Sequence, residues 1–69
     1  MRAELIAQAK RLAEERDWLW REPVEITSSV HRGDPVWIVR TNVLMRSPSV
    51  SVIVRKSDRA VVHTGYLLR

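Results

Sequence analysis

The spacing of the apolar residues changes once along this chain, near Pro23, and that change constrains the fold more than any other feature. Before Pro23, apolar side chains recur at spacings of three, four and seven, which is the pattern of a helix with one buried face. These residues are Leu5, Ile6, Ala9, Leu12, Ala13 and Trp20. From Val24 onward the period is two, as in strands that are buried on one side. The sequence therefore predicts an α+β fold in which the helix comes first.

The end of the helix is set by two residues. Pro23 cannot continue a helix, and it favours an extended conformation for Glu22. Asp17 tolerates the left-handed conformation in which many helices end. We therefore predict a helix over about residues 2–18.

Four alternating segments predict strands, and the turns between them are short. Gly33 and Pro35 indicate a turn after the first segment, and residues 57–59 (Ser-Asp-Arg) indicate a tight turn before the last. Short connections favour antiparallel neighbours. We predict one α+β domain over residues 1–69, with an N-terminal helix packed on an antiparallel β-meander of three to four strands, at about residues 24–31, 36–43, 49–56 and 60–68.

Alternation also predicts the two faces of this sheet. The residues expected to face the helix are Val24, Ile26, Trp37, Val39, Val50, Val52 and Val54. The opposite face collects Glu25, Thr27, His31, Val36, Ile38, Arg40, Ile53 and Arg55, joined by His63 or its neighbours, depending on the register. Aliphatic side chains beside arginines suggest a contact surface. Scattered exposed aliphatic residues are the alternative, and they are common in folded proteins.

A chain of 69 residues buries a small core and usually needs additional support. It has no cysteine, which excludes disulfides and thiolate metal sites, and its two histidines have no neighbouring ligand pattern. Self-association is the remaining way to support so small a core. The run from Ser47 to Val54 is β-prone and uncharged, so an open edge there would favour pairing between two copies.

The net charge of +4 lies entirely after residue 17. Solubility alone can account for this excess of positive charge, but the excess is also compatible with an anionic binding partner. An anionic-ligand or nucleic-acid binder would use Arg40, Arg46 and Arg55. Against nucleic acid, the chain lacks the stacking aromatics of RNA-recognition sheets and a second helix that could enter a groove.

Catalytic patterns are missing. There is no glycine-rich phosphate loop, no pair of carboxylates spaced for one pocket and no Ser-His-acid arrangement, so we expect a protein that is not an enzyme and that uses no cofactor or metal. No targeting segment is evident, and the longest uncharged run is far shorter than the roughly 20 residues of a membrane span. We expect a cytoplasmic protein without a membrane partner.

Two tryptophans flank Leu19 at the end of the predicted helix. Trp20 continues the apolar stripe and is expected in the core. The exposure of Trp18 depends on where the helix ends, so Trp18 either fixes the helix to the sheet or takes part in binding.

The layout resembles a recurrent bacterial pattern. A helix reading AELIAQAKRLAEERDW leads into EPVEI, then PVWIVRTN, then VSVIVRKSDRAVVHTGYLLR. This is similar to small cystatin-like modules grouped as PepSY-like domains and NTF2-fold or Imm35-type immunity proteins. Trp37 to Val39 matches their Trp-x-Val element, and Ser57 to Arg59 occupies their closing hairpin. The resemblance implies a non-catalytic module that binds, and can inhibit, another protein.

Together these observations favour a small protein-interaction module, immunity-like or regulatory, that associates with a protein partner or with itself through the sheet. The candidate binding residues are Arg40, Arg46, Arg55, Ile38, Ile53 and Trp18.

Overall fold

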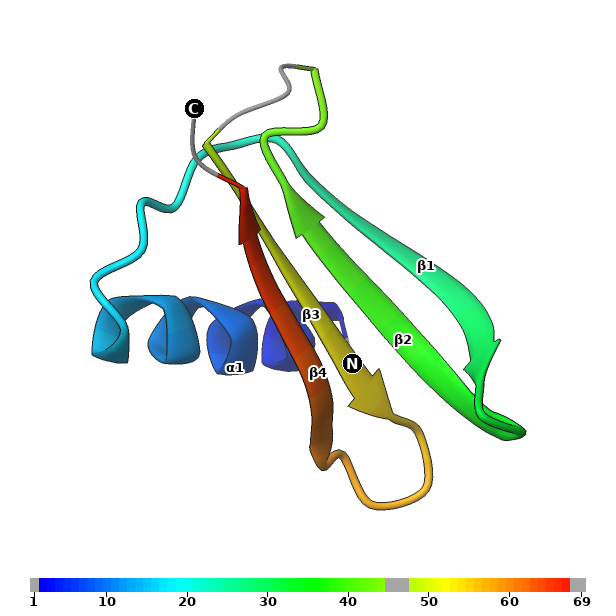
Figure 1. The fold of residues 1–69 in the computed structure, drawn as a ribbon. Helices are drawn as coiled ribbons and strands as arrows, with labels where there is room; N and C mark the ends of the chain where they lie inside the picture. Colours follow the sequence, from blue (N-terminus) through cyan, green and yellow to red (C-terminus); the bar gives the residue numbers. More distant parts are fainter. Residues whose placement is uncertain (1, 45–47, 68–69) are drawn as a thin grey trace.

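The computed structural model describes residues 2–44 and 48–67, which form one helix and one sheet (Figure 1). The helix α1 spans Arg2–Glu15. The four strands are β1 (Val24–His31), β2 (Asp34–Thr41), β3 (Ser49–Arg55) and β4 (Val61–Leu67). Their order in the sheet is β1-β2-β3-β4, and each neighbouring pair is antiparallel. The predicted α+β arrangement, an N-terminal helix followed by an antiparallel meander of four strands, is confirmed.

The helix ends at Glu15, three residues before the expected end. Asp17 takes the left-handed conformation with a φ of 61°. The backbone N–H of Asp17 donates to the carbonyl of Glu14 (3.2 Å), and the N–H of Trp18 donates to the carbonyl of Ala13 (2.8 Å). These two bonds form a Schellman motif, which satisfies carbonyl groups that a helix end leaves unpaired. Residues that favour a helix continue past Glu15, so the composition alone did not reveal where the helix ends.

The β1–β2 turn is tighter than the sequence suggested. Arg32 and Gly33 both have positive φ, 52° and 85°, as the two-residue turns that best match strand twist require. His31 therefore pairs directly with Asp34, and β2 begins there rather than at residue 36, with Pro35 inside the strand.

The remaining strand ends differ slightly from the predicted ones. β2 ends at Thr41 rather than at residue 43, and the Thr41 hydroxyl accepts a hydrogen bond from the N–H of Val50 (2.8 Å). β3 ends one residue earlier than expected, and β4 begins one residue later. The expected end of the last strand, residue 68, lies outside the described residues.

A single buried cluster joins side chains of the helix and the sheet. Its members are Leu5, Ala9, Ala13, Val39, Val50, Val52 and Val54. Trp18, Trp20 and Trp37 are partly buried against it, as are Val24 and Ile26. The sheet residues predicted to face the helix all belong to this cluster or pack against it. Trp20, expected in the core, is only partly buried against it, and it packs there from the segment after α1 rather than from the helix.

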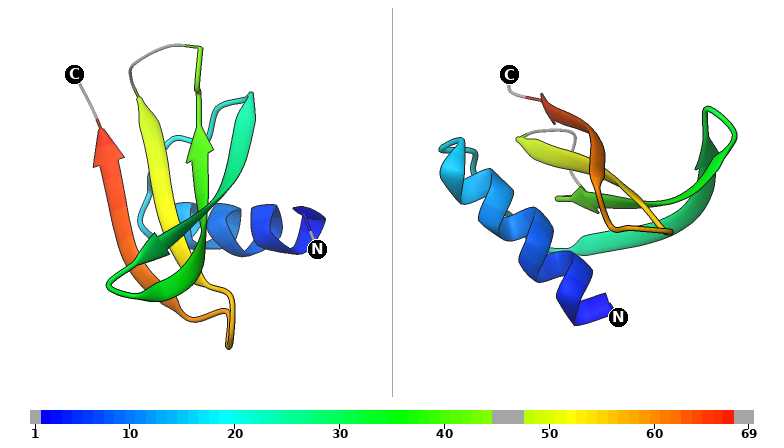
Figure 2. Two further views of the ribbon diagram at one scale, coloured as in Figure 1. Left: turned by 90° about the vertical axis from the view of Figure 1, so that its right-hand side faces the viewer. Right: turned by 90° about the horizontal axis from the view of Figure 1, so that it is seen from below.

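The sheet curls strongly at the end that carries the β1–β2 turn (Figure 2). The ring centroids of His31 on β1 and His63 on β4 are only 6.4 Å apart. We call the sheet face opposite α1 the far face. Because the sheet curls over it, Val36 on this face is only 1% exposed.

Candidate binding surface on the far face

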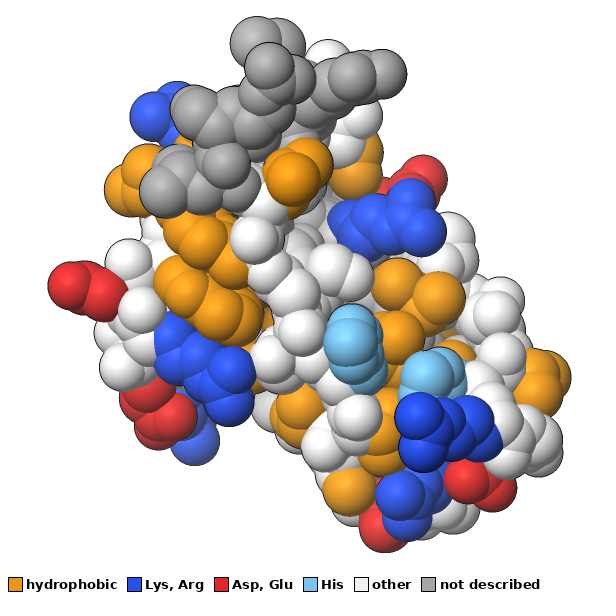
Figure 3. All heavy atoms as spheres, viewed as in Figure 1, with side chains coloured by type: hydrophobic (Ala, Val, Ile, Leu, Met, Phe, Trp, Pro, Cys, Tyr) orange, Lys and Arg blue, Asp and Glu red, His pale blue; other side chains and the backbone are white. Residues whose placement is uncertain are grey.

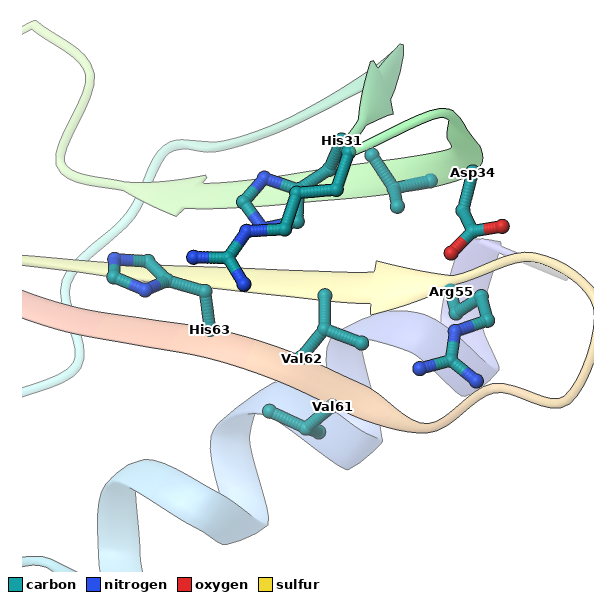
Figure 4. Close-up of a pocket in the computed structure, with 8 residues that line it drawn as sticks. His31, Asp34, Arg55, Val61, Val62 and His63 are labelled. Carbon is teal, nitrogen blue, oxygen red and sulfur yellow. The ribbon is translucent and has the colours of Figure 1, made fainter.

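The curled end of the sheet encloses a hollow of about 540 Å³ on the far face. Both histidines and neighbouring basic side chains surround apolar surface at this end of the molecule (Figure 3). The residues that line the hollow come from the β1–β2 turn and from the adjoining ends of the strands. They are His31, Arg32, Asp34, Val36, Arg55, Val61, Val62 and His63 (Figure 4).

The floor of the hollow continues along the two middle strands. Val36 lies opposite Arg55 in the β2–β3 pairing, and Ile38 lies opposite Ile53 two positions further along. Val36 is buried, and both isoleucines are half-buried. Cross-strand aliphatic pairs of this kind stabilise a sheet, and the helix does not cover them because it lies against the opposite face.

A register shift in β4 adds apolar lining. His63 pairs with Ile53, but the next β3 residue, Val54, pairs with Val61, so Val62 is the extra residue of a bulge. A bulge changes the side-chain alternation of its strand and increases the local twist. This is why Val61 and Val62, which are neighbours in the sequence, both line the hollow.

The charged groups of the hollow are unevenly paired. Arg55 forms an ion pair with Asp58 (3.2 Å), yet its buried Nε atom has no hydrogen-bond partner. In the part of the chain that the structure describes, the side chains of His31, Arg32 and His63 form no hydrogen bond or ion pair. The close-up in Figure 4 shows both imidazole rings projecting from the outer strands toward the middle of the sheet. Three donor side chains thus surround the hollow without partners.

The structure brings together only some of the predicted binding residues. Arg55 lines the hollow, and Ile38 and Ile53 adjoin it on the far face. Arg40 is exposed on the same face but lies toward the opposite end of the sheet, paired across the strands with Glu25. Arg46 lies outside the described residues.

Trp18 lies away from this surface, at the end of α1. Its ring stacks on Tyr66 with centroids 5.1 Å apart and planes 4° apart. The Arg16 guanidinium carbon is 5.3 Å from the centre of the Trp18 ring, and the Leu19 N–H donates to the Tyr66 hydroxyl (3.2 Å). Trp18 is half-buried by these contacts, which join the segment after the helix to β4.

The predicted set did not include His31, Arg32 or His63. Alternation placed His31 on the far face and allowed His63 there, but it gave no reason to bring the outer strands together. The sequence His-Arg-Gly-Asp was a signal for a two-residue turn at this end of the sheet, whose backbone twist matches that of the strands, but it does not by itself indicate the closure.

The open edges of the sheet are not at the strand where an open edge was predicted. β3 lies between β2 and β4, so Ser49 to Val54, the part of the predicted uncharged run that lies in β3, does not offer a free edge. The outer strands are β1 and β4. The β1 edge is partly engaged, because the Arg2 guanidinium donates to the carbonyl of Val24 (3.2 Å). Within residues 2–44 and 48–67, no hydrogen bond joins the backbone of β4 to a segment outside the sheet.

No group of three or more histidine, aspartate or glutamate side chains among the described residues could hold a metal ion. In the same residues, no helix has the length and apolar character needed to cross a bilayer. No family model matches the sequence, and neither the curated proteins nor the solved structures contain a match to it.

Proposed function

We propose that this protein is a non-catalytic protein-interaction module, immunity-like or regulatory, that self-associates through the outer edge of β4. One observation carries the proposal. The strand Val61–Leu67 reads VVHTGYL, with no proline, lysine, arginine or acidic residue, and it lies at the border of the sheet. In Figure 2 no other strand runs beside its outer edge, and the segment after α1 contacts only side chains of β4, those of Thr64 and Tyr66.

Such an edge presents unpaired N–H and C=O groups, and monomeric proteins usually protect it with charges, proline or a covering segment. Two copies that pair β4 with β4 across a two-fold axis would satisfy these groups in one antiparallel ladder. The same pairing would cover Val61 and Leu67, which are 38% and 49% exposed. It would also provide the support that a chain of this length needs.

The far face would then remain available to a second protein. Its half-buried isoleucines Ile38 and Ile53 provide apolar contact area, and Arg40 and Arg55 flank them. The resemblance of the sequence to cystatin-like immunity modules supports a partner that is bound and inhibited. In this proposal the helix closes the other face of the sheet and takes no part in binding.

Multi-angle light scattering over a wide concentration range tests the self-association. The wild-type protein should show a dimer that dissociates on dilution. Gly65→Lys places a charge at the middle of the β4 edge, where two copies would bring like charges together. A Cβ at Gly65 would meet the Ser51 Cβ at 4.0 Å, an ordinary contact, so the fold should tolerate the substitution.

Thr27→Lys is the matched control, because it adds the same charge to an exposed site on the other outer strand. We expect Gly65→Lys to be monomeric and Thr27→Lys to remain dimeric, with both variants folded by circular dichroism. A wild-type protein that is monomeric at every concentration, or a dimer that Thr27→Lys dissociates and Gly65→Lys does not, would contradict the proposal.

A further inference from the structure

We propose that the hollow on the far face is an acid-dependent binding site for a small tetrahedral oxyanion of the sulfate or phosphate class. His31 and His63 would hold the anion from the two outer strands, and Arg32 and Arg55 would supply fixed positive charge. This site goes beyond the proposed self-association and does not depend on it.

The first argument is geometric. The two imidazole rings lie 6.4 Å apart and are tilted by 33°. Charge-assisted N–H···O contacts are about 2.7–2.9 Å long, so one tetrahedral anion can accept a hydrogen bond from each ring through different oxygens. The hollow has ample volume for such an anion, about 540 Å³.

The second argument concerns charge. Two guanidinium groups, Arg32 and Arg55, face two carboxylates, because Asp34 lines the hollow and Asp58 pairs with Arg55. While both histidines are neutral, the fixed charges of the site therefore cancel. Protonation of His31 and His63 adds two positive charges and turns both rings into double donors. The affinity of the site for an anion should therefore depend on the protonation of the two histidines.

The same groups disfavour a metal ion. Two histidines alone do not complete a coordination sphere, and no group of three or more histidine, aspartate or glutamate side chains among the described residues could hold a metal ion. An anion can instead interact with all four basic groups that line the hollow.

Sulfate is the best probe, because its charge is constant over the range in which histidine titrates. We would measure its affinity by calorimetry at about pH 5.5 and about pH 8, on either side of that range. We expect wild-type binding to be tighter by roughly tenfold or more at the lower pH, because two nearby charges are gained. His ring resonances in NMR spectra should shift on addition of sulfate at the lower pH.

The variants separate the roles of the basic groups. His31→Gln and His63→Gln should each reduce the pH dependence, and the double variant should abolish it. Arg32→Gln should weaken binding at both pH values, leaving the ratio between them unchanged. Arg11→Gln is the control, because it removes one positive charge from an exposed position on α1 and should have little effect.

An affinity for sulfate that is the same at both pH values would overturn the proposal. So would an Arg11→Gln variant that loses as much affinity as His31→Gln, because binding would then follow net charge alone. Competition with a short single-stranded oligonucleotide identifies the source of the anion. Displacement of sulfate would assign the site to backbone phosphates, and retention of sulfate would assign it to a free anion.

Discussion

Trp18 stacks face to face on Tyr66, with ring centroids 5.1 Å apart and planes 4° apart. This contact joins the segment that leaves α1 to the last strand of the sheet. The Leu19 N–H donates to the Tyr66 hydroxyl at 3.2 Å, so the ring of Tyr66 and its hydroxyl both engage the same short segment. The stack therefore stabilises the connection between the helix and the strand that lies furthest from it in sequence.

Loss of the stack should destabilise the fold. Trp18 is half-buried, so we expect Trp18→Ala to lower the free energy of unfolding by about 2–3 kcal/mol, less than a fully buried tryptophan would. Trp18→Phe should recover part of the loss because it can still stack on Tyr66. Leu19→Ala, at a 51% exposed neighbour, serves as the control and should have a much smaller effect in urea denaturation.

The end of α1 offers a stabilising change. Asp17 has a φ of 61°, in the left-handed region where only glycine adopts the conformation without steric cost. Its negative charge also lies at the helix C-terminus, which favours cations. Asp17→Gly should raise the free energy of unfolding by about 0.5–1 kcal/mol. Glu14→Gly, in the last turn of the helix, should lower it by a similar amount, and thermal denaturation of both variants distinguishes the two sites.

The buried cluster is sensitive to cavities. Leu5 is 1% exposed and is the largest buried side chain that the helix contributes. Leu5→Ala should cost about 2–5 kcal/mol, a large part of the stability of a small domain. Leu44→Ala removes the same atoms from a side chain that is 81% exposed and should be nearly neutral. Equal unfolding midpoints for the two variants would show that the helix does not contribute to the core.

The pH dependence of the helix contact follows from one carboxylate. The Arg59 guanidinium donates to Glu4 at 3.1 Å, and this hydrogen bond and charge lower the pKa of Glu4 below its ordinary 4.5. A lowered pKa in the folded state stabilises the fold above the unfolded value, and this contribution is lost as the pH falls through the folded value. NMR titration of the Glu4 carboxyl should show a higher pKa in Arg59→Gln. An unchanged pKa would contradict the contact.

Local patterns in the sequence predicted much of the fold. The alternation that placed Val39 and Val52 toward the helix, and Ile38 and Ile53 away from it, depends only on strand geometry. The left-handed exit at Asp17 was also foreseeable from its residue type. The early end of the helix was not, because residues up to Arg16 all favour a helix and the backbone bonds of the Schellman motif have no fixed residue signature when glycine is absent.

The candidate site was harder to foresee. His31 and His63 lie on the two outer strands, and strand alternation contains no information about sheet curvature. Val36 illustrates the same point, since it was placed on an open face and is buried by the curl. The bulge that places both Val61 and Val62 at the hollow is a mismatch between two strands, so neither strand shows it alone.

The order of the strands has a consequence for synthesis of the chain. Each strand pairs with its neighbour in sequence, so each hairpin of the sheet can form as soon as its two strands are available. The helix is synthesised before the sheet, yet its buried residues Leu5, Ala9 and Ala13 pack with valines of β2 and β3. An isolated helix of this length is marginal in water. The helix therefore acquires its stable structure only after Ser49–Arg55 has been synthesised.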